Sequence, residues 1–458
     1  MSKVLVVNPP RFHGIPVIRE DRCENADRDC VQTPTSLVYI TGILRSLGHT
    51  VRLLDANGYN MPKPAVLWQI HKFKPDWVVL RSTVSTFEED TKVADYAKME
   101  GAKSILLNWN LHGVSEEDVL KKCPSLTRYL GLYHYEYVIP QIIDGEEHPK
   151  PKFTEDIPDP PWGDLPNFDP YFMRTKWLKP WVVVRGSKGC GWRCAFCVDQ
   201  SQRLYKRSPE LIGDELEYLV NRGVKYISFF DDTWESDENW SMNIIKQIED
   251  RQLKFRWYIN SRSDMIVRRG LAFFKRARKA GLDGSSFGIE FGTDEMLKRV
   301  KKDTTVAINT EATQILHKAG IKSYASLMMG YLGETKEQMM ETANWVRRVK
   351  PTAFQINPVY PIFGTTLWAE AESMGLIDKS KLDWKGLACV PTGLMDWKFT
   401  EYSPQELYKI RRQMYRKIYF SSWALYNLLK WSWRNPELTL GYGISMLGRM
   451  RNGFTFSH

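Results

Sequence analysis

The sequence predicts an α/β protein with two parallel-sheet domains and a helical C-terminal segment. Short β-rich runs alternate with helical patterns over the first 140 residues, the alternation resumes at residue 181, and the β signal ends near residue 385. Alternating strands and helices are typical of parallel sheets. We therefore expect domains at 1–150 and 181–385, a proline-rich linker at 151–180, and a helical, basic and aromatic domain at 386–458.

The first domain reads as a Rossmann-like, doubly wound sheet. Its expected strands are "KVLVVNPP", "HTVRLLDANG", "PDWVVLRSTVS" and "KSILLNWN", and helices are expected at "SLVYITGILRSLG" and "EEDTKVADYAKMEGA". Ligands of such sheets bind beyond the carboxyl ends of the strands. The loops after Asn8, Asp55, Arg81 and Leu107 are thus the expected binding rim. No G-x-G-x-x-G motif is present, which disfavours a dinucleotide.

The second domain reads as six β/α units. The expected strands are "WVVVRGS", "KYISFFDD", "FRWYINSRSD", "GSSFGIEFG", "KSYASLMMG" and "AFQINPVYP". Such a series indicates a barrel or partial barrel with its active site at the carboxyl ends of the strands.

Composition and charge are those of a globular protein. Apolar residues make up 43% and charged residues 26% of the 458 residues. No apolar run reaches about 18 residues and the start lacks a signal peptide pattern, so we expect a cytoplasmic protein. The net charge is +10, and much of the surplus lies beyond residue 405. That face could meet an acidic partner or a membrane surface, but a solvated helix face is the default and no nucleic acid is expected.

Three of the seven cysteines, Cys190, Cys194 and Cys197, lie within eight residues. An odd count with one tight cluster argues against a disulfide scaffold. Thiolates suit zinc or an iron–sulfur cluster. A zinc site would need a remote fourth ligand, and none lies near in the sequence.

The spacing Cys-x3-Cys-x2-Cys, with Phe196 before the last cysteine and a barrel strand before the first, resembles the radical S-adenosylmethionine (SAM) superfamily. The resemblance implies that the three thiolates hold a [4Fe–4S] cluster and leave one iron open. SAM would chelate that iron through its amino and carboxylate groups. One electron from the cluster would then cleave SAM to methionine and a 5′-deoxyadenosyl radical.

Other segments fit the same resemblance. "FFDD" and "INSRSD" end the second and third strands, and "FGIEFG", "MMGYLGET" and "YPIFGTTL" follow in register. An N-cap role for Asp232 and a surface ion pair for Arg262 remain alternatives. The SAM contacts implied are Phe196, Asp231, Asp232, Arg262, Glu290, Met329 and Tyr360.

The first domain resembles the cobalamin-binding domain that precedes one branch of radical SAM enzymes. The alternative is a Rossmann-like sheet with another ligand or none. The Asp-x-His-x-x-Gly loop is absent, as is usual in that branch, and Asn108 and Trp109 stand where a Gly-Gly pair is common. The cobalamin contacts implied are Asp55, Arg81, Ser82, Thr83, Ser85, Thr86, Asn108 and Trp109.

Together the resemblances imply a cobalamin-dependent radical SAM methyltransferase that methylates an unactivated carbon. An electron donor of the flavodoxin or ferredoxin type is expected, and no general base is assigned. The substrate stays open among protein side chains, such as a glutamine of methyl-coenzyme M reductase, small molecules, lipids and tetrapyrroles. Rival hypotheses are an anaerobic tetrapyrrole cyclase, a non-catalytic Fe–S or corrinoid carrier, and a methylthiotransferase. The last would need a second cluster, and the spacing of Cys23, Cys30 and Cys123 does not match it.

Overall fold

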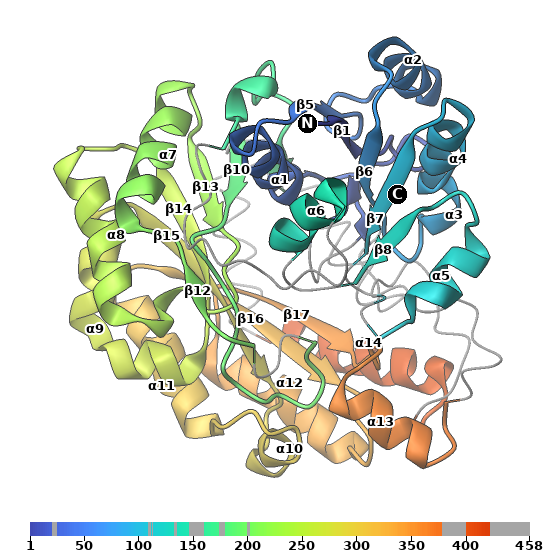
Figure 1. Cartoon of the computed structure of the whole chain (residues 1–458). Coiled ribbons are helices and arrows are strands. Elements are labelled where there is room, and N and C mark those ends of the chain that lie inside the picture. Colours follow the sequence, from blue (N-terminus) through green and yellow to red (C-terminus); the bar gives the residue numbers. More distant parts are fainter. Residues whose placement is uncertain are drawn as a thin grey trace.

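The computed structural model describes residues 1–20, 25–108, 111, 113–131, 135–145, 160–173, 179–198, 202–377 and 400–421. Within them, a five-stranded and a six-stranded parallel sheet lie side by side, with helices on their faces (Figure 1). The predicted α/β fold class is confirmed.

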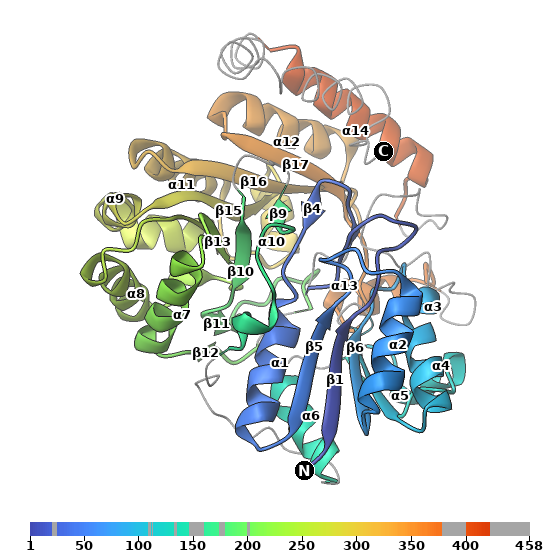
Figure 2. The same cartoon turned by 90° about the horizontal axis from the view of Figure 1, so that it is seen from above.

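The five-stranded sheet has the order β5-β1-β6-β7-β8. Its strands are β1 (Lys3–Asn8), β5 (Thr50–Asp55), β6 (Trp77–Arg81), β7 (Lys103–Leu107) and β8 (Arg128–Leu130). Helices α1 (Thr35–Ser46) and α6 (Tyr135–Asp144) cover one face. The other face carries α2 (Lys63–Phe73), α3 (Phe87–Asp90), α4 (Lys92–Met99) and α5 (Glu116–Lys122) (Figure 2). Burial on both faces explains the continuous apolar runs of these strands.

The six-stranded sheet has the order β10-β13-β14-β15-β16-β17. Its strands are β10 (Trp181–Val184), β13 (Tyr226–Phe229), β14 (Arg256–Ser261), β15 (Leu282–Glu290), β16 (Lys322–Met329) and β17 (Ala353–Pro358). The helices are α7 (Pro209–Asn221), α8 (Glu238–Asp250), α9 (Ser263–Lys279), α10 (Asp294–Arg299), α11 (Val306–Lys318), α12 (Lys336–Val349) and α13 (Thr366–Ser373). The first and last strands do not pair, so this is the partial barrel that the six predicted units indicated.

Both edges of the partial barrel are covered by other parts of the chain. At β10, Thr33 Oγ1 accepts from the N–H of Val183 at 3.0 Å, and Thr35 Oγ1 donates to the carbonyl of Val183 at 2.7 Å. At β17, the Tyr415 hydroxyl accepts from the N–H of Ile356 at 3.2 Å. Tyr415 belongs to α14 (Pro404–Tyr419), which packs beside α12. Such coverage hinders the pairing of these edges with another chain.

Short elements tie the linker region to both sheets. Strand β4 (Cys30–Val31) pairs with β9 (Phe172–Met173), and β2 (Val17–Ile18) pairs with β3 (Asn25–Ala26). A 3₁₀ turn (Trp162–Asp164) places the Trp162 indole N–H 2.7 Å from Glu215 of α7. Gly113 packs so closely on Gly364 that a Cβ on residue 113 would lie 2.7 Å from the backbone nitrogen of Gly364. The two sheets are therefore firmly joined.

Of the predicted C-terminal domain, residues 400–421 are described, and they are mainly helical. Its distal aromatic and basic residues lie outside the described part, as do Cys23 and Cys389. Among the described helices, none is long and apolar enough to cross a membrane.

Candidate active site

The three clustered cysteines lie on the loop that follows β10. Strand β11 (Ser187–Lys188) leads into this loop and pairs with β12 (Tyr205–Lys206) where the chain returns. A turn closes where the carbonyl of Cys194 accepts from the N–H of Cys197 at 3.0 Å. Cys194 is buried, Cys190 and Cys197 are half-buried, and none forms a disulfide. We call residues 186–198 the cysteine loop.

The three thiols fit an iron–sulfur cluster rather than a single metal ion. Among the described residues, no three His, Cys, Asp or Glu side chains are placed to hold a metal ion as they stand. Three thiols on one short loop nevertheless match the donor chemistry of an iron–sulfur cluster.

Two aspartates that follow β13 hold that backbone. Asp231 accepts from the N–H of Gly186 at 2.9 Å and from the Ser187 hydroxyl at 2.6 Å. Asp232 accepts from the N–H of Gly189 at 2.8 Å. Asp231 is fully buried, and burial raises its pKa to about 7. The pair predicted to meet SAM therefore also positions the cysteine loop.

Arg262 lies against the same loop. Its guanidinium donates to the Cys194 sulfur at 3.5 Å and stacks over the Trp192 ring, 4.4 Å from the centroid. Asp264 and the carbonyl of Lys302 accept from its other nitrogens at 3.0 and 2.6 Å. Burial lowers the pKa of Arg262, but the charges of Asp264 and Cys194 outweigh it and leave that pKa raised. The alternative of a surface ion pair is wrong, because Arg262 is 5% exposed.

Glu290, at the end of β15, is paired with a cation. Lys302 donates to it at 2.7 Å, and the same ammonium lies 5.9 Å from the Phe196 ring centroid. Glu290 has a φ of 60°, and its carboxylate folds back to within 2.0 Å of where a Cβ on Gly288 would stand. A Cβ at position 288 would therefore displace the Glu290 carboxylate and the Lys302 ammonium from their present positions. The sequence did not reveal Lys302, because it lies twelve residues from its partner.

The two remaining SAM predictions differ in placement. The Met329 side chain is fully buried in the core beneath the helices, so it does not face the barrel interior. Tyr360 is half-buried after β17 and packs against apolar residues. Between them, Glu334 accepts from the N–H groups of Gly330 and Tyr331 and holds the loop after β16.

Burial raises the pKa of Glu334 to about 8. The folded state therefore holds a proton that the unfolded state releases, so stability falls as pH rises from about 4.5 to about 8, by roughly 1.4 kcal/mol per pH unit. We predict that Glu334→Gln, whose carbonyl can still accept both bonds, removes this dependence. The variant should match the wild type near pH 5 and exceed it near pH 9 in thermal unfolding. Glu337→Gln, on an exposed carboxylate, is the control, and parallel pH profiles for Glu334→Gln would contradict the prediction.

The predicted cobalamin contacts gather at the rim of the five-stranded sheet. Asp55 accepts from Asn8, from the N–H of Gly58 and from the Tyr171 hydroxyl, the last at 2.6 Å. The Asn108 amide donates to the Ser82 hydroxyl at 3.1 Å.

The remaining rim hydroxyls also bond to one another. Thr83 bonds to Ser85 and Thr86 at 3.0 and 2.8 Å, and Thr86 donates to Asp90. These rim side chains are thus already bonded within the protein. Trp109 lies outside the described residues.

A buried charge network joins that rim to the cysteine loop. Lys188 donates to both carboxylate oxygens of Glu136 at 2.9 Å and lies 4.1 Å from the Tyr135 ring centroid. The Tyr135 hydroxyl accepts from Arg81 at 3.1 Å, and Arg81 also faces Glu20 at 3.4 Å. Burial lowers the pKa of Lys188 to about 8. The sequence missed this network, because its members come from four separate segments.

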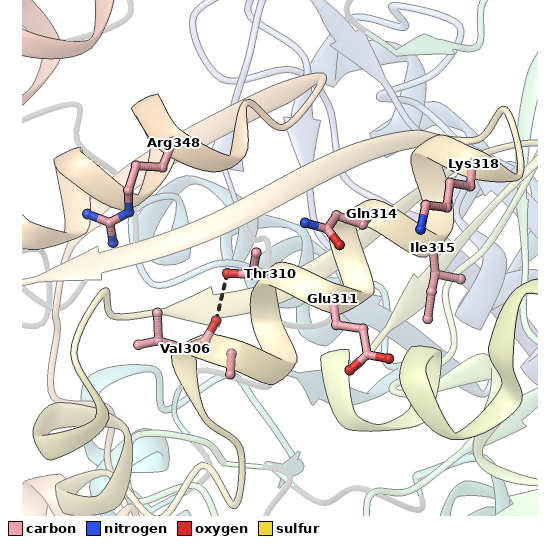
Figure 3. Close-up of a pocket in the computed structure, with 8 residues that line it drawn as sticks. Val306, Thr310, Glu311, Gln314, Ile315, Lys318 and Arg348 are labelled. Carbon is pink, nitrogen blue, oxygen red and sulfur yellow. Dashed lines mark hydrogen bonds between the residues drawn. The ribbon is translucent and has the colours of Figure 1, made fainter.

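A depression of about 670 Å³ lies elsewhere, on the outer surface of α11 (Figure 3). Its lining includes Thr310, Glu311 and Gln314 of α11 and Arg348 of α12. These side chains lie on the helical layer outside the sheet and are no part of the cysteine site.

Comparison with known proteins agrees with this geometry. Residues 184–346 match the family model described as the radical SAM superfamily. The chain is 24% identical to an uncharacterized methyltransferase, PH0819, of Pyrococcus horikoshii, over 92% of this chain and 93% of that protein. It is 26% identical to the anaerobic magnesium-protoporphyrin IX monomethyl ester cyclase of Rubrivivax gelatinosus, over 69% of this chain but only 62% of the cyclase.

Two solved structures share the fold. The cobalamin-dependent SAM radical enzyme OxsB, solved with aqua-cobalamin and SAM, superposes with a TM-score of 0.65 at 15% identity, covering 84% of this chain and 63% of OxsB. The radical SAM methyltransferase TsrM from Kitasatospora setae, solved with cobalamin and a [4Fe–4S] cluster, gives 0.64 at 15% identity, covering 82% and 76%.

The class of the partial barrel follows from these matches: residues 184–346 match the radical SAM superfamily, and they include the three clustered cysteines. The pairing of an N-terminal five-stranded sheet with the partial barrel gives the chain the same overall fold as OxsB and TsrM.

Proposed function

We propose that this protein is a cobalamin-dependent radical SAM methyltransferase that adds a methyl group to an unactivated carbon. The observation that carries the proposal is the cysteine loop, which presents three thiols at the carboxyl end of the first barrel strand. Cys190, Cys194 and Cys197 would hold a [4Fe–4S] cluster. With SAM and cobalamin bound, these groups would supply the radical and the methyl group.

The cofactor contacts are proposals of different strength. Phe196 belongs to the cysteine loop, and Asp232, Arg262 and Glu290 lie beside it, which supports all four as SAM contacts. For cobalamin, Gln32 and Asn57 each bury an amide nitrogen without a hydrogen-bond partner in the described structure. Both belong to the N-terminal region that forms the rim, and such donors fit a ligand with carbonyl groups along its edge. We therefore place the corrin over this rim.

The substrate is proposed as a protein or peptide side chain, such as a glutamine, with an electron donor of the flavodoxin or ferredoxin type. A second candidate function is a tetrapyrrole cyclase, which the similarity to the Rubrivivax gelatinosus protein favours. Product analysis separates the two, because a methylase leaves its substrate heavier by one methylene unit.

Anaerobic purification and reconstitution test the proposal. We expect about four irons per chain, extractable cobalamin, and 5′-deoxyadenosine from SAM after reduction. About eight irons would instead indicate a methylthiotransferase. A protein without corrin would overturn the cobalamin assignment, and reduced protein that leaves SAM intact would indicate a carrier.

Arg262 provides a further prediction. Its cation lies beside the Cys194 sulfur and would favour the reduced, more negative cluster. We expect Arg262→Gln to lower the midpoint potential of the cluster and Arg262→Lys to lower it less. A redox titration followed by electron paramagnetic resonance measures this. Arg276→Gln, on the exposed part of the helix that begins after Arg262, is the control, and an unchanged potential in Arg262→Gln would contradict the prediction.

A further inference from the structure

The inward face of the last four barrel strands carries uncharged polar side chains. Along each strand, buried apolar residues beneath the helices alternate with partly buried residues. The helices of this domain lie on one side of the sheet (Figure 1), so the partly buried positions, which alternate with the residues packed against the helices, face its other side. They include Tyr258 and Asn260 of β14, Ser286 of β15, Tyr324, Ser326 and Met328 of β16, and Gln355 and Asn357 of β17.

The strand register sets these side chains in rows. Ser286 stands opposite Tyr324. One step nearer the carboxyl ends, Gly288 stands opposite Ser326, and Ser326 stands opposite Gln355. Neighbouring strands are about 4.8 Å apart, so side chains of adjacent strands can contact the same small group. We call these two rows the polar rows.

Several polar groups on this inward face have no hydrogen-bond partner within the described part of the protein. The Tyr324 hydroxyl donates to the Gln355 carbonyl at 2.9 Å, which leaves both N–H donors of the Gln355 amide for another partner. Within the part of the chain that the structure describes, the side chains of Ser286, Ser326 and Asn357 have no hydrogen-bond partner. Polar groups inside a barrel that lack protein partners are typical of a ligand site.

Among the described inward positions of these four strands, charged side chains occur only at the strand ends. Arg256 and Lys322 begin β14 and β16, and Lys322 is paired with Asp283. Glu290 ends β15 and is paired with Lys302. A carboxylate or phosphate between these ends would lose water without gaining a cation, which is costly. A neutral group that both accepts and donates hydrogen bonds would be satisfied.

We propose that the polar rows bind the substrate and select an uncharged carboxamide over a carboxylate or phosphate. The Gln355 amide donates to the substrate carbonyl, while the Ser286 and Ser326 hydroxyls accept from its N–H groups. This inference rests on the proposed function, because it takes the barrel interior as the place where the substrate meets the radical.

Calorimetry on the reconstituted full-length protein tests the selection. The probes are N-acetyl-L-glutamine methylamide and N-acetyl-L-glutamate methylamide, which differ in carboxamide against carboxylate. We expect the amide to bind about tenfold more tightly, the effect of one hydrogen bond to a desolvated group. Gln355→Leu should weaken amide binding by a similar factor, and so should Gln355→Glu if the leucine variant fails to fold. The matched control is Gln314→Leu, at the outer depression in Figure 3, which should change nothing.

Each remaining outcome counts against the inference. Equal or tighter binding of the glutamate probe, no binding of either probe, or amide binding that survives both Gln355 variants would overturn it. Formation of 5′-deoxyadenosine is measured on the same samples. If SAM is cleaved while the amide is not preferred, the inference fails and the proposed function stands. If the amide binds through Gln355 but SAM is not cleaved, the proposed function fails and the polar rows remain an amide site.

Discussion

Cys194→Ala is expected to leave the protein folded but without a cluster and without activity on SAM. The side chain is buried in the cysteine loop beside Arg262, and two thiolates alone do not retain a stable [4Fe–4S] cluster. Iron should fall from about four per chain to less than about one. The visible absorbance of the cluster and the formation of 5′-deoxyadenosine should both disappear.

The control for this prediction is another buried cysteine. Cys123 lies in the core of the five-stranded sheet after α5, where burial raises the pKa of its thiol. Cys123→Ala should therefore keep its iron and its activity on SAM. Loss of iron in this variant, or retention of a full cluster in Cys194→Ala, would show that the cysteine loop is not the cluster site.

Glu136→Gln is expected to destabilise the protein by about 3–5 kcal/mol, the usual cost of removing one member of a buried ion pair. It would leave the Lys188 ammonium buried between the two sheets without its carboxylate. Denaturant unfolding measures the effect through the midpoint of the first transition, because a protein with two cores need not unfold in one step. Glu117→Gln, in an exposed pair with Lys121, should leave that midpoint unchanged.

A double variant distinguishes a buried charge from a lost contact. Glu136→Gln combined with Lys188→Met removes both charges and keeps similar volumes, so most of the lost stability should return. If the double variant is as unstable as Glu136→Gln, the pair contributes packing rather than electrostatics. If Glu136→Gln unfolds like the wild type, the pair is not buried in solution.

The sequence predicted the fold well because its signals are local. Each barrel strand is a short β-rich run, with alternating burial in β14 and β16, and the crossover helices have their own periodicity. Strand β8 and helix α6 were missed. Strand β8 has three residues, and α6 contains Pro140, which normally signals the end of a helix.

The site was only partly predictable, because its contacts join distant segments. The cysteine spacing is visible in eight residues, but nothing in the sequence assigns Lys302 to Glu290 or Glu136 to Lys188. Arg262 was expected beside SAM, and its contact with Cys194 depends on how β14 ends next to the loop. Met329 was chosen from a motif, whereas strand alternation turns its side chain to the helical layer.

The covered edges of the partial barrel bear on how such a protein can evolve. The backbone of β10 is hydrogen-bonded to Thr33 and Thr35, and that of β17 to Tyr415. The edges of the barrel are therefore covered by residues that lie before and after it in the sequence. If recombination moved the gene segment for the barrel alone into another gene, the encoded barrel would have two unpaired strand edges. The three parts of this chain are therefore expected to be inherited together, and new substrates to be acquired by point substitution within the barrel rather than by exchange of modules.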